Sequence, residues 1–149
     1  MIYIASDHGG FKLKKRLVRF FKNDLKIDVE DMGPSEYDKD DDYPDYAEPL
    51  AKKVSKNKDN LGILICGSGQ GMCMLANKVK GIRAALGYSI ESAELSRKHN
   101  NSNMLCLAGY VVTDDHAMAI VKKWISTPFS KAERHIRRLR KLEKIEKNN

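Results

Sequence analysis

The sequence has little of what marks secreted, metal-binding or membrane proteins. It contains only three cysteines, and no two of them have the C-x-x-C spacing of zinc sites. No apolar run approaches the roughly 20 residues that a membrane-spanning helix needs, and residues 1–5 are typical of a strand rather than a signal peptide. An odd number of cysteines without a secretion signal favours free thiols in a reducing compartment. We therefore expect a cytoplasmic protein with no membrane partner.

The composition indicates one globular domain over residues 1–149. Hydrophobic residues make up 42% of the chain and charged residues 32%, a balance typical of folded proteins. The net charge of +7 is spread unevenly, because residues 131–147 carry eight Lys or Arg against three Glu. We expect a nearly neutral domain that ends in a basic segment.

Short apolar runs alternate with longer amphipathic ones along the chain, which predicts strands alternating with helices. The predicted strands are residues 2–5, 27–29, 61–66, 82–86 and 104–108. The predicted helices are residues 11–23, 46–55, 72–79, 90–99, 114–125 and 130–147, with an acidic loop at 36–45. Ser130 and Glu133 have the spacing of a capping box at the start of the last helix.

This order predicts an α/β fold, a three-layer Rossmann-like sandwich. A five-stranded parallel sheet has helices on both faces, and the C-terminal helix 130–147 is an addition to it. Ligands of such sheets bind at the carboxyl ends of the strands. We expect the segments after the first and third strands, and the loop before the fifth, to reach the same rim.

A glycine-rich loop follows the third strand, with glycines at Gly67, Gly69 and Gly71 around Ser68. Such a loop can turn tightly and present several backbone N–H groups in one direction. It has neither the spacing of a dinucleotide fingerprint nor the lysine of a Walker A loop. A tight strand-to-helix turn explains the glycines equally well, so the loop alone is weak evidence for a site.

Cys66 is the last residue of the third strand and directly precedes these amides. This position suits a reactive thiol, and it equally suits one more buried apolar residue. Cys73 and Cys106 lie within apolar runs and are expected in the core. Position alone leaves both interpretations of Cys66 open.

Acid–base groups occur at the predicted ends of elements. Asp7 and His8 follow the first strand, and His99 precedes the fifth. We take these as candidate site residues, whereas His116 and His135 lie in helical stretches and are interpreted as structural.

The basic C-terminal helix carries Arg134 and Arg138 four residues apart, on one face. Two guanidinium groups on one face suit a phosphate dianion, although most charges of this helix are explained by solvation. Nucleic-acid binding is disfavoured, because the segment lacks aromatic residues and the acidic loop 36–45 would repel a phosphate backbone.

Together these segments resemble the ribose-5-phosphate isomerase B and galactose-6-phosphate isomerase family. The matching pieces run in family order: Asp7-His8-Gly9-Gly10, Asp42-Tyr43-Pro44, Cys66-Gly67-Ser68-Gly69-Gln70-Gly71, Ala76-Asn77-Lys78, Gly81-Ile82-Arg83-Ala84-Ala85, Ser96-Arg97-Lys98-His99-Asn100-Asn101 and Arg134-His135 with Arg137-Arg138. The resemblance implies a five-stranded parallel sheet and an enzyme that needs no metal or cofactor. It also implies a homodimer or tetramer with sites built from two subunits, and helix 130–147 at the interface.

The resemblance further implies an aldose–ketose isomerisation of a sugar phosphate through an enediolate. Cys66 would move the proton between C2 and C1, while Ser68 and the amides of residues 67–71, those of Gly67, Gly69 and Gly71 included, would hold the oxyanion. His99 would help open the sugar ring, with Asp7 and Tyr43 nearby. The other substrate-binding residues implied are Asn100 for sugar oxygens and His8, Arg134 and Arg138 for phosphate.

Two positions depart from what the resemblance describes. One branch of the family has a glutamate base where this chain has Met72, so the resemblance indicates the cysteine type. Many relatives carry a phosphate-binding arginine where this chain has Tyr110. The expected substrate is ribose 5-phosphate, with a six-carbon phosphate such as allose or galactose 6-phosphate as the alternative. A non-catalytic phosphosugar sensor is a further hypothesis, and retention of Cys66 and His99 argues against it.

Overall fold

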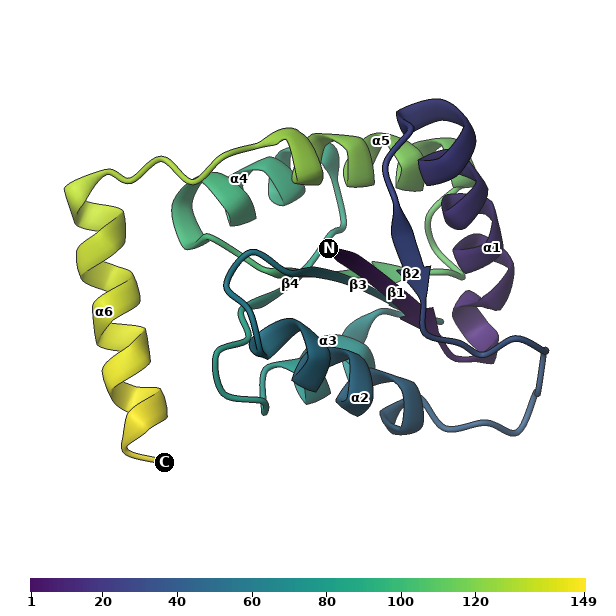
Figure 1. Cartoon of the computed structure of the whole chain (residues 1–149), viewed down its shortest axis with the longest axis horizontal. Helices are drawn as coiled ribbons and strands as arrows, with labels where there is room; N and C mark the ends of the chain where they lie inside the picture. Colours follow the sequence, from purple (N-terminus) through teal and green to yellow (C-terminus); the bar gives the residue numbers. More distant parts are fainter.

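A computed structural model describes residues 1–149, and its five strands form one parallel sheet in the order β2-β1-β3-β5-β4 (Figure 1). The strands are β1 Ile2–Ser6, β2 Val29–Asp31, β3 Leu61–Cys66, β4 Ala84–Leu86 and β5 Met104–Ala108. The helices are η1 His8–Gly10, α1 Phe11–Phe20, η2 Phe21–Leu25, α2 Pro44–Ser55, α3 Gln70–Ala76, α4 Ile90–Asn100, α5 Asp114–Ser126 and α6 Glu133–Lys147. The five-stranded parallel α/β fold predicted from the sequence is confirmed.

Strands β1, β3 and β5 are buried on both faces, which explains why they read as continuous apolar runs. Along β1, Ile2 and Ile4 pack with α1, α4 and α5, whereas Tyr3 and Ala5 pack with α2 and α3. Side chains alternate because successive residues of a strand point to opposite faces. The result is a three-layer sandwich with a core on each side of the sheet.

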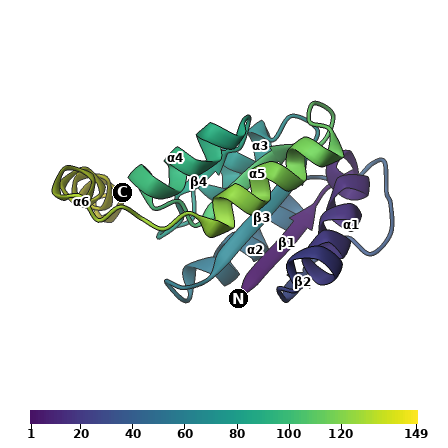
Figure 2. The same ribbon diagram turned by 90° about the horizontal axis from the view of Figure 1, so that it is seen from above.

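Helix α6 stands apart from this sandwich, on the side of β4 and away from β1 (Figures 1 and 2). Its apolar side chains Leu142 and Ile145 are 52% and 63% exposed. An open groove separates the helix from the sandwich, and Ile82 lies on its far side. No helix in the structure combines the length and the apolar character needed to cross a membrane.

The predicted start of α6 is wrong. Ala132 is the N-cap residue, and no side chain caps the helix. Lys131 adopts a left-handed conformation with φ 56°, so the helix begins later than the Ser130 capping box requires. The Ser130 hydroxyl instead accepts a hydrogen bond from Ala132 N and lies 2.7 Å from His135 Nδ1.

The other boundaries differ from prediction by a few residues. The first helix changes at Phe21 to a single π-helical turn, which ends at Lys26 with φ 55°. The second strand therefore begins at Val29 rather than at residue 27. Helix α3 begins at Gln70, two residues before the predicted start, and so follows the glycine loop directly.

Candidate active site

The carboxyl ends of β1, β3 and β5 meet, and the loops that follow them are bonded to one another. Gly109 N donates to Cys66 O at 2.8 Å, and Tyr110 N donates to Gly67 O at 3.0 Å. Glycine is required where the loops touch, because a Cβ on Gly9 would lie 2.7 Å from Gly67 N. These contacts fix the loop after β3 against the loop after β1.

Cys66 is the last residue of β3 at this carboxyl edge and is only 5% exposed. Its Sγ accepts a hydrogen bond from Gly69 N at 3.2 Å. Gly69 reaches this geometry with φ 75°, a conformation that favours glycine. The Ser68 hydroxyl is exposed beside it and accepts from Gln70 N at 3.3 Å. The loop therefore donates a backbone hydrogen bond to the sulfur and exposes the Ser68 hydroxyl next to it in the sequence.

Two tyrosine rings flank the same loop. A Cβ on Gly71 would lie 2.7 Å from the ring of Tyr43, and one on Gly67 would lie 2.6 Å from the ring of Tyr110. Both rings are exposed at their outer edges, Tyr110 to 72%. The glycines thus make room for aromatic walls on either side of Cys66.

Asp7 follows β1 and is almost fully buried at this edge. Its Oδ1 accepts hydrogen bonds from Gly9 N at 2.8 Å and Gly10 N at 3.3 Å, which caps the short helix η1. Burial raises the pKa of the Asp7 carboxyl, and the Gly9 amide partly offsets that rise. This carboxyl is therefore suited to exchanging a proton nearer neutrality than an exposed aspartate.

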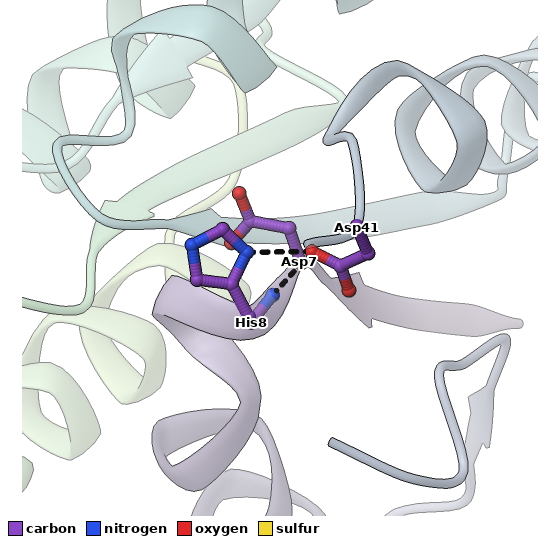
Figure 3. Close-up of side chains that lie close together, drawn as sticks. All are labelled: Asp7, His8 and Asp41. Atoms are coloured by element: carbon purple, nitrogen blue, oxygen red, sulfur yellow. Dashed lines mark hydrogen bonds and ion pairs between the residues drawn. The ribbon is translucent and has the colours of Figure 1, made fainter. Parts of the chain in front are cut away.

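His8 is held by Asp41, a residue that the sequence analysis did not single out (Figure 3). His8 Nδ1 lies 2.6 Å from Asp41 Oδ1, and His8 N donates to the same oxygen at 3.0 Å. The hydrogen bond to Asp41 raises the pKa of the His8 imidazole. The ligand-type atoms of Asp7, His8 and Asp41 lie within 4.8 Å of one another, and Asp7 Oδ1, His8 Nδ1 and Asp41 Oδ1 are engaged in the hydrogen bonds described.

His99 and Asn100 do not reach this edge, so the prediction of one common rim is wrong for them. They end α4, directly before β5 begins. In a parallel sheet the segment before a strand lies at the amino edge, opposite the carboxyl ends that carry Cys66. The carboxyl edge holds the segments that follow strands, so His99 and Asn100 do not lie there.

The His99 ring stacks on the His135 ring of α6, with centroids 4.4 Å apart and planes inclined by 38°. His135 is buried, and its Nδ1 pairs with the Ser130 hydroxyl. Burial and then the nearby His99 and arginines lower the pKa of His135. Sequence reasoning interpreted His135 as structural and missed its contact with His99, although it adjoins Arg134.

Arg134 and Arg138 project from α6 and are both exposed. They are neighbours in the sequence of His135, whose ring stacks on His99, and their helix α6 lies on the β4 side of the molecule, away from β1 (Figure 2). Within one chain the predicted site residues thus form two separate groups. The first contains Asp7, His8, Tyr43, Cys66, Gly67, Ser68, Gly69 and Gly71, and the second contains His99, Asn100, Arg134 and Arg138.

Comparison with known proteins assigns the chain to a family. The family described as Ribose/Galactose Isomerase matches residues 2–142. The chain belongs to the ribose/galactose isomerase family. This confirms the resemblance identified from the sequence motifs.

Relatives within the ribose/galactose isomerase family share both sequence and fold with this chain. The crystal structure of ribose-5-phosphate isomerase B from Mycoplasma genitalium with bound ribulose-5-phosphate is 48% identical, with a TM-score of 0.95 over 99% of this chain and 97% of that one. The Thermotoga maritima ribose 5-phosphate isomerase structure is 41% identical, with a TM-score of 0.90 over 96% and 97%. Ribose-5-phosphate isomerase B from Mycobacterium tuberculosis (strain H37Rv) is 38% identical over 99% of this chain and 91% of its own length.

Proposed function

We propose that this chain is an aldose–ketose isomerase that interconverts ribose 5-phosphate and ribulose 5-phosphate, with Cys66 as the base. The observation that carries this proposal is the buried thiol under the Gly67–Gly71 loop, at the carboxyl edge of a family fold. The Mycoplasma genitalium relative whose structure contains ribulose-5-phosphate supports the choice of substrate.

In the reaction, Cys66 removes the proton from C2 of the open-chain aldose. The electron pair forms the C1–C2 double bond, and negative charge develops on O1. Return of the proton from Cys66 to C1, with transfer of a hydroxyl proton from O2 to O1, gives the ketose. We assign stabilisation of the oxyanion to the Ser68 hydroxyl and the loop amides, and each such donor contributes roughly 3 kcal/mol in comparable sites.

The second group of residues is assigned to the same active site through a second copy of the chain. We infer a homodimer or tetramer in which His99 and Asn100 of one subunit complete the site around Cys66 of another. The exposed apolar side of α6 and its open groove support this assembly. Such a face is costly to leave in water and suits burial against a partner.

Phosphate binding is assigned to His8 together with Arg134 and Arg138 from the partner subunit. Guanidinium groups suit a phosphate dianion because they donate in a fixed fork. Tyr110 carries no charge, so three side-chain cations remain for the phosphate. His99 is assigned to ring opening, in which it takes the proton of the C1 hydroxyl as the bond from C1 to the ring oxygen breaks and then delivers that proton to the ring oxygen.

The test is turnover of ribose 5-phosphate by the purified chain in the presence of EDTA. Wild type and Cys73→Ala should form ribulose 5-phosphate, because Cys73 lies on α3 outside the loop. Cys66→Ala should lose about 100- to 10,000-fold in kcat, the usual contribution of a positioned base. Turnover that survives in Cys66→Ala would remove Cys66 from this role, and a preference for allose 6-phosphate would change the substrate.

A further inference from the structure

We propose that Asp41 is a positioning residue that keeps the His8 imidazole doubly protonated and turns its Nε2–H toward the substrate phosphate. The identity of the anion rests on the proposed function, whereas the pairing of the two side chains does not. Asp41 belongs to the acidic loop before α2, 33 residues from His8 in the sequence. The loop therefore contributes a functional contact rather than only a solvated surface.

The contacts with Asp41 fix the orientation of the His8 ring. Asp41 Oδ1 accepts from both the backbone and the ring of His8, at 3.0 Å and 2.6 Å. Two contacts to one oxygen fix the orientation of the ring as well as its position. The other ring nitrogen, Nε2, points away from Asp41 (Figure 3). It is the nitrogen left to contact a ligand, and the His8 side chain is 30% exposed.

The partners of the two ring nitrogens determine which of them carries a proton in His8. A carboxylate at Nδ1 requires a hydrogen on that nitrogen, because a carboxylate can only accept. In a neutral imidazole Nε2 would then be a bare acceptor. A phosphate dianion is likewise an acceptor, so the two would repel. Only the doubly protonated ring can bond Asp41 and phosphate together.

The buried carboxylate of Asp41 favours a positive charge on His8. The Asp41 side chain is only 5% exposed, and its Oδ2 has no hydrogen-bond partner within the chain. A buried carboxylate is costly unless a cation compensates it. His8 is the cation in contact with it. The pair therefore stabilises charge on both partners.

The groups around His8 also favour a positive ring. Asp7 precedes it, and Asp38 and Asp41 face it from the acidic loop. Tyr37 of the same loop meets the ring edge-on at 6.5 Å between centroids. From α2, Tyr46 faces Asp41, and burial and that carboxylate raise the pKa of its phenol. Burial of His8 opposes protonation, but the Asp41 hydrogen bond is the larger effect on its pKa.

The first experiment follows the His8 ring protons by NMR as the pH is raised. Wild type and Asp40→Asn should titrate above the ordinary histidine pKa of about 6.5, and Asp41→Asn should titrate lower. Asp40 is the matched control, because it is an exposed carboxylate of the same loop. This readout needs no turnover, and a wild-type His8 that titrates at or below 6.5 would overturn the pairing. A shift of the wild-type titration on adding EDTA would identify a bound metal and would overturn it too.

The second experiment separates positioning from a structural role. Asp41→Asn should raise KM for ribose 5-phosphate about tenfold at pH 8, with kcat within about twofold, as expected for loss of one charged hydrogen bond. The difference should shrink toward pH 5.5, where His8 is protonated in both proteins. In a His8→Asn background, Asp41→Asn should add little. The proposal would be overturned if Asp41→Asn raised KM equally in the His8→Asn background, or if its effect on KM did not depend on pH. An inactive wild type would overturn only the proposed function.

Discussion

The residues at the carboxyl edge of the sheet are fixed by the fold of one chain, whereas the arginines on α6 are not. Cys66 and Asp7 are buried and each accept a hydrogen bond from a backbone amide two or three residues further on, and His8 is paired with Asp41 of the acidic loop. Arg134 and Arg138 are exposed on a helix that stands away from the sandwich (Figure 1). One half of the proposed site is therefore preorganised within the chain.

This contrast teaches how the two halves are expected to work. A preorganised half can hold reacting atoms and developing charge without rearranging. An exposed half on a sparsely packed helix acquires its final geometry from the surface it meets, and we propose that a second copy of the chain supplies that surface. Changes at the carboxyl edge should affect chemistry, and changes on α6 should affect phosphate binding and assembly.

Outside the carboxyl edge, the largest effect is expected for His99→Asn. Kcat/KM with ribose 5-phosphate should fall about 100- to 1,000-fold, as for loss of a general acid–base group. Exchange of a C1 hydrogen of ribulose 5-phosphate with D2O should be nearly unchanged, because this ketose cannot close a furanose ring through its phosphorylated C5 oxygen and the exchange needs only proton transfer. His116→Asn on α5 is the control and should match wild type in both turnover and exchange. Equal losses of turnover and exchange would contradict a role in ring opening.

A smaller effect is expected for Arg134→Ala. KM for ribose 5-phosphate should rise about 10- to 100-fold with little change in kcat, because one charge-assisted contact to phosphate is lost. Arg140→Ala removes the same charge from the outer side of α6, where Arg140 lies with Lys131 and Arg137. Steady-state kinetics of both variants provide the comparison. A similar rise in KM for Arg140→Ala would mean that α6 attracts the substrate only through its net charge.

Gly9→Ala tests how closely the carboxyl edge is packed. The new Cβ would meet Gly67 N at 2.7 Å, and backbone cannot yield as a side chain does. We expect a loss of about 1–3 kcal/mol in the free energy of unfolding, the usual effect of overpacking, measured by urea denaturation. Lys12→Ala on the exposed side of α1 should stay within about 0.5 kcal/mol of wild type. A fully stable Gly9→Ala would show that the two loops can separate.

The smallest effect concerns His135 and pH. Its folded-state pKa is lowered, so the unfolded chain binds more protons just below the ordinary histidine pKa of about 6.5. Stability is therefore complete above pH 6.5 and falls as the pH drops toward the lowered value. Melting temperatures from pH 7.5 to 5 should decrease more for wild type than for His135→Gln. Parallel curves would contradict a buried, neutral His135.

Local sequence patterns predicted the sheet well because β1, β3 and β5 are buried on both faces and so read as apolar runs. They also located Cys66 and the Gly67–Gly71 loop, since a strand end followed by glycines is a local signal. His99 was assigned to the wrong edge, although its place directly before β5 in a parallel sheet already puts it at the amino edge. The patterns also failed where position depends on the whole fold.

Asp41 was missed for a related reason. Within the acidic loop it looks like any solvated carboxylate, and its burial follows only when the loop folds over His8. The exposed apolar side of α6 is visible in the sequence as a helical pattern, but a pattern does not identify the surface that covers it. An experiment on assembly identifies the surface that covers α6.

The most direct test of a site shared between two chains is complementation between Cys66→Ala and His99→Asn. Each variant alone should be nearly inactive toward ribose 5-phosphate. After the two are unfolded together and refolded as a mixture, half of the dimers should be mixed, and each of these should contain one fully intact site. The account predicts recovery of about a quarter of wild-type activity. Activity no higher than that of the separate variants, with mixed dimers demonstrated by mass spectrometry, would contradict it.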